Sequence, residues 1–461
     1  MNYFKNKTIH FIGIGGIGMS AIAEILYDMG FAIQGSNDVE NANTLRLKAR
    51  GIPVFLGQKD ISVLKDVDVA IVSSATPKDC PEVLEAERKG IPIGHRSEML
   101  AELLKEKQGI AVAGTHGKTT TSSMISHVLD CAGKEPSFII GGVLNKYKTN
   151  ARLGKGPLMV VEADESDGSF LRLPRMVSVV TNIDAEHLDY YGSFEREKEA
   201  FLNFLNSTDF YGFNVICTDH PVLKEFKSQI KRKTFSYGFN ETADYRAINE
   251  KVANGRLCFD VQTDNKTRAG FELQLFGRHN ILNALACIAT ARQLGVEWDD
   301  IKTALSTFSG VERRFTKRGE FQGIQIYDDY AHHPVEIQAV LQAAKQAATP
   351  HHVIAFFQPH RYSRAKDLMT DFASCFKDAD IVYVSDIYAA GEKPLPDINK
   401  EKLVEKIKQT GHPNAFILDG KENLSKVVLE KAQSGDIVVG LGAGDISKWM
   451  QTLPKNLGEK K

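Results

Sequence analysis

The chain lacks the features that mark secreted, zinc-binding or membrane-spanning proteins. Its 461 residues include only six cysteines, which are widely spaced and form no Cys-x-x-Cys pair. Such spacing is poor evidence for a disulfide framework or a zinc site and is typical of a reducing compartment. The sequence has no apolar run of the roughly 18 residues that a membrane helix needs, and its N-terminal segment leads into a glycine-rich turn rather than a cleavable leader. We therefore expect a cytoplasmic protein with no membrane partner.

An excess of charge of one sign is also absent. The sequence has 57 Lys and Arg against 58 Asp and Glu, which gives a formal net charge of −1. A protein so balanced has no global field that would gather nucleic acid, so we expect no nucleic-acid partner. The last residues, from Pro454 onward, are basic and predict a solvated tail.

Apolar runs typical of strands alternate with helical patterns along the whole chain. This alternation predicts an α/β fold with mostly parallel sheets, and the length allows about two to four domains. We predict three domains. They are a Rossmann-like N-terminal domain over 1–108, a central P-loop ATPase domain over 109–311 and a C-terminal Rossmann-like α/β domain over 312–461.

A phosphate-binding loop is the most specific motif of the sequence. It follows a predicted strand at 109–113 and precedes a predicted helix from Thr119. Glycines allow backbone N–H groups to converge on phosphate oxygens, Lys118 can neutralise the β- and γ-phosphates, and the Thr119 hydroxyl can reach Mg²⁺. The first glycine of the general motif is missing, because Val112 stands in its place. The residues expected to bind ATP here are Gly114, Thr115, His116, Gly117, Lys118, Thr119 and Thr120.

Two acidic motifs follow that could hold the magnesium ion of ATP. Glu162 ends the apolar strand of VVEADESDGSF, so its carboxylate should project at the carboxyl edge of the sheet. The motif TNIDAEHLDYYG follows another strand and contains His187. His187 is a plausible ligand of a second Mg²⁺, although Mg²⁺ prefers oxygen.

A second glycine turn lies near the N-terminus, between a strand and a helix. Its context fits a dinucleotide fingerprint, with an acid twenty residues further on, but the same geometry can hold the diphosphate of any nucleotide. Small polar residues follow the second strand, where an NAD enzyme more commonly has a strand ending directly in an acid. Both interpretations remain open from these residues alone. The residues expected at this site are Gly13, Gly15, Gly16, Gly18, Ser36, Asp38, Ser73, Ser74, His95 and Arg96.

Eight motifs in order resemble the Mur ligase family of peptidoglycan synthesis, over essentially the whole chain. They are HFIGIGGIGMS, GTHGKTTT, EADESDGSF, HLDYYG, GRHNILNALA, GVERRF, DDYAHHP and FQPHRYSR. The variant phosphate loop is the form that this family uses. The resemblance implies that the three domains hold a UDP-sugar, ATP and an amino acid, in that order. It implies an ATP-dependent ligase that joins L-alanine to the lactyl carboxylate of UDP-N-acetylmuramate through an acyl phosphate.

The same resemblance assigns residues to roles. It implies Thr119, Glu162 and His187 as metal positions, and Arg314 as a catalytic positive charge beside Lys118. Attack by the amine also needs a base that accepts a proton, and His332 is the candidate for this role. The ATP positions that the resemblance adds are His279, Asn280, Asn283, Arg314 and Asp329. Those of the amino-acid pocket are Tyr330, His332, His360, Arg361 and Arg364.

One position departs from the pattern of several sister ligases. They carry a carbamoylated lysine about fourteen residues past the metal histidine, whereas this chain has Phe201. The alanine-adding branch is expected to lack that lysine, so the departure favours this branch. It leaves open what else completes the second metal site.

Three alternatives are kept. A related ligase could add a preformed peptide to the same UDP-sugar. A nicotinamide-dependent dehydrogenase would account for the first glycine turn but leaves GTHGKTTT unexplained. A non-catalytic nucleotide switch would bind ATP without amino-acid-stimulated phosphate release. For the oligomeric state, we expect a monomer or a weak homodimer.

Overall fold

The computed structural model describes residues 6–459, which form two compact units. Residues 6–249, 259–271 and 282–308 make up the first unit, and residues 250–258, 272–281 and 309–459 make up the second. The described residues build three sheets, and the division between the units passes through the last three strands of the second sheet. No helix among these residues is both long and apolar enough to cross a membrane.

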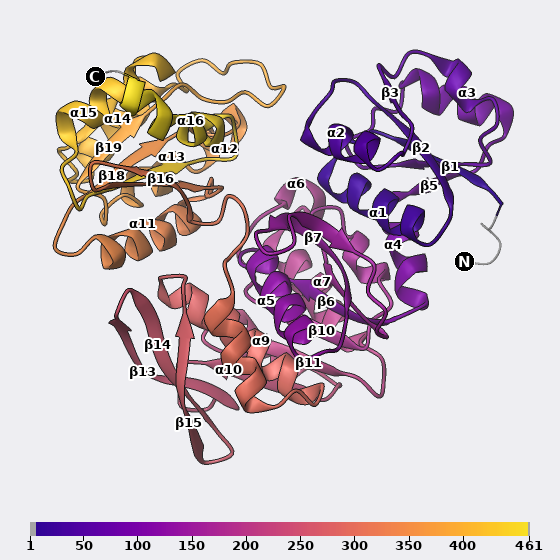
Figure 1. The fold of residues 1–461 in the computed structure, drawn as a ribbon, viewed down its shortest axis with the longest axis horizontal. Coiled ribbons are helices and arrows are strands. Elements are labelled where there is room, and N and C mark those ends of the chain that lie inside the picture. The colour runs from indigo at the N-terminus through magenta and orange to yellow at the C-terminus, as the bar shows by residue number, and fades with distance from the viewer. Residues whose placement is uncertain (1–5, 460–461) are drawn as a thin grey trace. The chain divides into compact units, whose positions relative to one another are not determined.

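The first sheet is a parallel Rossmann-like sheet with the strand order β3-β2-β1-β4-β5. Its elements are β1 (Thr8–Ile12), α1 (Ile17–Asp28), β2 (Ala32–Asn37), α2 (Ala42–Ala49), β3 (Val54–Leu56), η2 (Ile61–Leu64), β4 (Val69–Val72), α3 (Pro81–Lys89), β5 (Ile93–His95) and α4 (Arg96–Lys105) (Figure 1). The order reverses beside β1, so a crevice is expected at the carboxyl ends of β1 and β4. Gly13 follows β1 and Ser73 follows β4 at that edge.

The second sheet has ten strands in the order β15-β14-β13-β12-β11-β10-β6-β9-β7-β8. Its strands are β6 (Gln108–Ala113), β7 (Ser137–Leu144), β8 (Thr149–Arg152), β9 (Leu158–Glu162), β10 (Val177–Val180), β11 (Phe213–Cys217), β12 (Thr234–Gly238), β13 (Tyr245–Ala253), β14 (Arg256–Thr263) and β15 (Lys266–Leu273). Strand β6 is fully buried from its second residue and pairs in parallel with both β9 and β10. The carboxyl ends of these three strands therefore meet at one edge of the sheet.

Helices flank this second sheet and connect its strands. They are α5 (Lys118–Cys131), η3 (Ser169–Arg172), α6 (Leu188–Tyr191), α7 (Phe194–Asn206), α8 (Pro221–Phe226), α9 (Arg278–Gln293) and α10 (Trp298–Thr307). Helix α5 packs on β7 and β9 and begins at the carboxyl end of β6. This is the strand–loop–helix unit in which a phosphate loop is built.

The third sheet has the order β16-β17-β21-β18-β19-β20, with β16 antiparallel to β17 and the other pairs parallel. Its elements are β16 (Thr316–Phe321), β17 (Ile324–Asp329), α11 (Pro334–Ala348), β18 (Val353–Phe357), α12 (Tyr362–Asp367), α13 (Met369–Ser374), β19 (Ile381–Val384), α14 (Lys400–Gln409), β20 (Ala415–Ile417), η4 (Lys421–Asn423), α15 (Leu424–Lys431), β21 (Ile437–Leu441) and α16 (Ile446–Glu459). Its core lies on both faces of the sheet, around Phe356 on one face and Phe357 on the other.

The predicted solvated tail is wrong for residues 454–459. Helix α16 continues through Pro454 to Glu459, and Leu453 and Leu457 are each only 1% exposed. Leu453 and Leu457 are four residues apart, so they lie on the same face of the helix, and this face packs on the sheet. The basic composition of the segment did not indicate this apolar face. The last two residues of the tail lie outside the described residues.

Candidate functional site

The phosphate loop turns sharply between β6 and α5, and Gly114 is where it turns. Gly114 has φ +125°, and a Cβ added there would lie 2.2 Å from the Thr181 Oγ1 atom. Val112, in contrast, is a fully buried strand residue that pairs with Glu162 and Val179. The loop therefore needs its glycine at 114 rather than at 112, which explains the departure from the general motif.

The segment after β10 holds this loop in shape. The Thr181 hydroxyl donates to the His116 carbonyl at 2.6 Å, and the His116 N–H donates to the Asn182 side chain at 2.7 Å. The Thr115 hydroxyl in turn accepts from the Asp184 N–H at 2.8 Å. Neither Thr181 nor Asn182 was among the predicted site residues, although both stand in the motif that suggested His187. A loop fixed from outside in this way is ready to bind phosphate without reordering.

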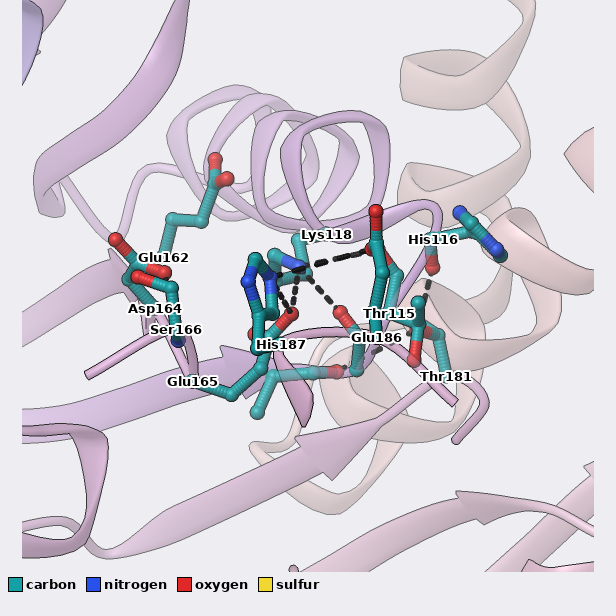
Figure 2. A network of polar contacts seen from close by, with 12 residues as sticks. Thr115, His116, Lys118, Glu162, Asp164, Glu165, Ser166, Thr181, Glu186 and His187 are labelled. Carbon is teal, nitrogen blue, oxygen red and sulfur yellow. Dashed lines mark hydrogen bonds and ion pairs between the residues drawn. The ribbon is translucent and has the colours of Figure 1, made fainter. Parts of the chain in front are cut away.

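Lys118 lies inside the loop among carboxylates (Figure 2). Its ammonium donates to the Gly114 carbonyl at 2.5 Å and to the Glu165 carboxylate at 2.7 Å. Burial alone would lower the pKa of Lys118, but the charges of Glu165 and Glu162 outweigh it and the pKa is raised. Lys118 thus stays charged at neutral pH, as neutralisation of a polyphosphate requires.

Two of the predicted metal positions are in direct contact. The Thr119 hydroxyl donates to the Glu162 Oε2 atom at 2.9 Å, and the Gly141 N–H donates to the same oxygen at 2.8 Å. The parallel pairing of β6 and β9 produces this contact, because it places the start of α5 beside the last residue of β9. A hydroxyl and a carboxylate oxygen form a donor pair that suits Mg²⁺.

The third predicted metal position, His187, lies beside a carboxylate that the sequence did not single out. His187 adopts φ +56° before α6, and its Nε2 atom is 3.9 Å from the Glu165 Oε1 atom. Glu165 is 1% exposed, and its Oε2 atom has no hydrogen-bond partner among the described residues. Burial raises the pKa of Glu165, although Lys118 acts in the opposite direction. Glu165 stands three residues after Glu162 in EADESDGSF, so a second acid in that motif was the available signal.

These residues fit magnesium by their chemistry. Within residues 6–459 no three His, Cys, Asp or Glu side chains converge on one point as a ready-made metal cage. Mg²⁺ does not need one, because it typically takes one or two carboxylates and completes its shell with water and phosphate oxygens. Thr119, Glu162 and the unpartnered oxygen of Glu165 supply oxygen donors of that kind.

The first glycine turn is also shaped by hydrogen bonds from a neighbouring strand. The Gly13 and Ile14 N–H groups both donate to the Ser36 carbonyl at 2.9 Å, and the Gly15 N–H donates to the Asn37 side chain at 3.0 Å. Helix α1 begins just after this turn with Gly16 as its N-cap. The helix N-terminus can therefore receive a diphosphate.

A buried polar network supports that turn from below. The Ser36 hydroxyl donates to the Glu82 carboxylate at 2.5 Å, and the same oxygen lies 3.2 Å from the His10 Nε2 atom. All three side chains are fully buried. Ser36 was predicted as a ligand-binding residue, and the structure places its side chain beneath the turn rather than at its surface. His10 and Glu82 were not predicted, because 72 residues separate them in the sequence.

The other residues predicted for this site lie at the carboxyl edge of the same sheet. Ser74 contacts His95 at 3.1 Å and donates to the Asp167 carboxylate at 2.6 Å. Arg96 donates to the Asp164 carboxylate at 2.9 Å and lies near Gly18, where an added Cβ would be 3.4 Å from its Nη1 atom. These contacts join the predicted sugar-binding residues to the loop after Glu162. Ser73 donates its N–H to the Thr76 hydroxyl at 3.1 Å, and Asp38 is exposed.

The predicted adenine-contacting residues lie at the start of α9. In the second unit, the Asn280 side chain donates to the Phe276 carbonyl at 2.7 Å and contacts the His279 ring at 3.1 Å. Burial lowers the pKa of His279 to about 4, so the ring is neutral at pH 7. In the first unit, Asn283 accepts from the Thr121 hydroxyl at 3.1 Å and so contacts the helix of the phosphate loop.

In the second unit, Asp329 organises the segment that carries Arg314. Its two carboxylate oxygens accept from the N–H groups of Phe315 and Ala331, each at 2.7 Å, and it is 3% exposed. Burial raises the pKa of Asp329 to about 6, although the nearby Arg314 acts in the opposite direction. The Arg314 guanidinium lies over the Tyr330 ring at 5.4 Å.

Four rings of the second unit form a row that contains three predicted amino-acid residues. The centroids are 5.1 Å apart from Tyr330 to His332, 6.0 Å from His332 to His360, and 5.5 Å from His360 to Tyr388. Burial lowers the pKa of His360 to about 4, with the positive charges around it adding to the effect. Tyr388 was not predicted. It is joined to the pocket through its backbone, because the Arg361 N–H donates to its carbonyl at 2.8 Å.

The two arginines predicted to bind a carboxylate flank the first turn of α12. Arg361 precedes the helix with φ +69°, and Arg364 lies within it. Between them, the Ser363 N–H and hydroxyl donate to the Glu392 carboxylate at 3.0 and 2.6 Å. Glu392 thereby fixes the segment that carries both guanidinium groups.

Comparison with known families decides the classification. Three family descriptions match successive parts of the chain: Mur ligase family, catalytic domain, at 8–108; Mur ligase middle domain at 112–291; and Mur ligase, glutamate ligase domain, at 313–444. Together they cover most of the sequence.

The chain belongs to the Mur ligase family.

Individual Mur ligases match the chain over nearly its full length. The UDP-N-acetylmuramate–L-alanine ligase of Parvibaculum lavamentivorans is 50% identical over 98% of this chain and 93% of its own. The enzyme of the same name from a Chelativorans species is 49% identical over 98% of both chains. A solved structure of UDP-N-acetylmuramate-alanine ligase from Thermotoga maritima has a TM-score of 0.85 at 31% identity, covering 98% of this chain and 100% of that one.

The classification confirms the three-domain α/β fold expected from the Mur ligase resemblance. It gives no support to the dehydrogenase alternative, since all three matched descriptions are those of ligase domains. That the first glycine turn holds a diphosphate stays a prediction. The Phe201 position is fully buried, and its ring packs on Phe170 at 5.3 Å, so it supplies no metal ligand.

Proposed function

We propose that this chain joins L-alanine to the lactyl carboxylate of UDP-N-acetylmuramate and converts ATP to ADP and phosphate. The observation that carries the proposal is the convergence of Lys118, Thr119 and Glu162 at the phosphate loop of a Mur ligase. The relatives that are about half identical over the whole chain carry the name of this activity, which supports the choice of substrates.

In the proposed first step, a lactyl carboxylate oxygen attacks the γ-phosphorus of ATP. The bond from that phosphorus to the β,γ-bridging oxygen breaks, ADP leaves, and an acyl phosphate forms. Phosphoryl transfer needs positioning and neutralisation of charge more than covalent help. Lys118, held charged by its carboxylate neighbours, provides positive charge at the loop. Arg314 is proposed to add a second positive charge.

Magnesium is proposed to bind at Thr119 and Glu162, with His187 and Glu165 beside a second ion. When bound, it would neutralise phosphate oxygens and polarise the γ-phosphoryl group. The burial of Thr119 and Glu165 supports a role for the protein in keeping bulk water from these two donors.

In the proposed second step, the neutral amine of L-alanine attacks the acyl carbon and phosphate leaves. The amine nitrogen loses a proton as the amide forms, and His332 is proposed to accept it. The His332 Nδ1 atom lies 3.0 Å from the Tyr330 carbonyl, a contact that favours the tautomer with the proton on Nδ1. Nε2 is then the basic nitrogen of the neutral ring.

The amino-acid pocket is proposed to grip the alanine carboxylate with Arg361 and Arg364. Guanidinium groups bind carboxylates with paired hydrogen bonds, and Glu392 fixes the segment between them. The UDP diphosphate is proposed to lie at the first glycine turn, with Arg96 released from Asp164 to contact it. We further propose that the chain works in the cytoplasm, which its six free cysteines suit. A monomer or weak homodimer stays a prediction.

The test is product formation from purified protein, ATP, Mg²⁺ and UDP-N-acetylmuramate with either L-alanine or a tripeptide. Mass spectrometry should detect an alanine adduct with equimolar ADP, and little adduct from the tripeptide. A tripeptide adduct in place of the alanine adduct would support the peptide-adding alternative. ATP binding with no adduct from either amine would support a nucleotide switch.

A further inference from the structure

Helix α7 buries a carboxyl group for which the described residues provide no ion pair. Glu197 is fully buried, and its Oε1 atom has no hydrogen-bond partner among the described residues. Its Oε2 atom accepts a single bond from the Glu186 N–H at 3.3 Å. A buried carboxyl group without a compensating opposite charge favours its protonated form. A bound cation beside Glu197 would favour the ionised form instead.

Three acidic side chains act electrostatically on Glu197. Burial raises the pKa of Glu197 to about 8, and Glu165, Glu186 and Asp184 act in the same direction. Glu165 is itself buried with one unpartnered oxygen, while Lys118 occupies its other oxygen. Two buried carboxyl groups thus each have one oxygen without a hydrogen-bond partner among the described residues, and of the two only Glu165 has an ion pair with a lysine.

Glu197 is linked to His187 through the backbone of Glu186, which precedes His187 in the chain. The Glu186 N–H that Glu197 accepts belongs to the residue just before His187, and the His187 Nε2 atom lies 3.9 Å from Glu165 and 4.0 Å from Glu186. Phe201 lies one helical turn after Glu197 on α7 and is fully buried in the core. Glu197 is the acidic residue on this buried face of the helix.

We propose that Glu197 supplies the carboxylate charge that holds a second divalent cation beside His187. This inference rests on the proposed ATP-dependent function. Because no three acidic or histidine side chains within residues 6–459 converge as a metal cage, Glu197 acts across the water shell of the ion, as outer carboxylates of metal sites do. It also positions His187 through the backbone of Glu186.

The variants separate charge from shape. Glu197→Gln keeps the size of the side chain and removes its charge, whereas Glu197→Asp keeps the charge. Glu197→Leu is a second charge-free variant that suits a buried helix face. Glu199→Gln is the matched control, because Glu199 lies on the same helix and is exposed.

The experiment is a titration of the full chain with Mn²⁺, followed by electron paramagnetic resonance, in the presence of a non-hydrolysable ATP analogue. We expect two Mn²⁺ per chain in the wild type. Glu197→Gln and Glu197→Leu should keep one ion at unchanged affinity and bind the other about tenfold or more weakly. Glu197→Asp should fall between them and the wild type, and Glu199→Gln should match the wild type. Without metal, Glu197→Leu should have a Tm no lower than that of the wild type.

The outcomes distinguish this inference from the proposed function. One Mn²⁺ in the wild type, or two ions of wild-type affinity in both charge-free variants, would overturn the role of Glu197 and leave the ligase proposal intact. Equal weakening of both ions would overturn it too, because that result indicates a general loss of structure. Failure of the wild type to bind both the ATP analogue and Mn²⁺ would instead contradict the proposed function.

Discussion

The two glycine turns of the first unit look alike in sequence but differ in what surrounds them. Each follows an interior strand of a sheet and opens a helix, and each is held by hydrogen bonds from a neighbouring strand end. Beneath the first turn, Ser36, Glu82 and His10 form a buried network, in which the Glu82 Oε1 atom has no hydrogen-bond partner among the described residues. Inside the second lies Lys118, bound to a buried carboxylate.

This difference is consistent with a first turn that only binds its ligand and a phosphate loop that takes part in the reaction. The first turn offers backbone N–H groups, and Arg96 lies beside Gly18 at the start of its helix. The phosphate loop combines its backbone with the buried ammonium of Lys118 and with the carboxylates of Glu162 and Glu165 that act on it. A site that transfers a phosphoryl group needs such concentrated charge, whereas a site that only holds a diphosphate does not.

The largest expected effect is that of removing the charge from the second turn. Lys118→Ala should lower turnover by about 10³-fold or more, because the charge that develops on the γ-phosphoryl group loses its fixed counter-charge. Binding of UDP-N-acetylmuramate should persist, since Lys118 is not part of the first turn. Phosphate release and calorimetric titration with the UDP-sugar measure the two effects. The exposed Lys134 provides a control, and Lys134→Ala should retain wild-type turnover. Wild-type turnover in Lys118→Ala would contradict the assignment.

The next effect tests the shape of the loop rather than its charge. Gly114→Ala should lower the free energy of unfolding by about 1–3 kcal/mol from backbone strain, and the contact with Thr181 should weaken nucleotide binding as well. Urea denaturation and titration with an ATP analogue measure both. Gly133 has φ +70° with open space around it, so Gly133→Ala should cost less and leave nucleotide binding unchanged. Equal nucleotide affinity in the two variants would remove the proposed reason for the glycine at 114.

A third prediction concerns the pH dependence of stability, in which two buried histidines of the first unit, His127 and His10, have different surroundings. His127, in α5, is 2% exposed and contacts the Ala304 carbonyl at 3.0 Å, whereas His10 contacts Glu82. Burial lowers the pKa of His127 to about 4. The unfolded chain, with a pKa near 6.5, takes up the proton first. Stability is therefore lost as the pH falls from about 6.5 to about 4, by about 2 kcal/mol from this group.

The variant His127→Gln should reduce that acid-dependent loss of stability. The measurement is the free energy of unfolding at pH 7 and at pH 4.5 for both proteins. The difference between the two pH values should be smaller in the variant. A difference as large as in the wild type would show that the ring of His127 does not control the effect.

The smallest effect belongs to the first turn. Asn37→Ala removes the acceptor of the Gly15 N–H and should cost about 1 kcal/mol, which corresponds to about fivefold weaker binding of UDP-N-acetylmuramate. Affinity for an ATP analogue should not change. Titration with each ligand in turn measures this. Weaker ATP binding together with unchanged UDP-sugar binding would reverse the roles given to the two turns.

Local patterns in the sequence predicted most of the fold, whereas the roles of the site residues stay predictions. The pairing of Thr119 with Glu162 could be foreseen, because strand ends in a parallel sheet meet at one edge. Glu82 could not be, since only folding brings it to His10. The β7–β8 hairpin was missed because its second strand, Thr149–Arg152, is short and polar. Glu197 was missed because one buried acid in a charged helix resembles its exposed neighbours in sequence.

The central claim, that the phosphate loop activates the lactyl carboxylate, can be tested with one labelled substrate. UDP-N-acetylmuramate carrying ¹⁸O in both lactyl carboxylate oxygens would be incubated with the chain, ATP, Mg²⁺ and L-alanine, and the released phosphate analysed by mass spectrometry. The acyl-phosphate route predicts one ¹⁸O atom in each phosphate formed and one in the new amide carbonyl. Phosphate without ¹⁸O, released in step with the amide product, would contradict it.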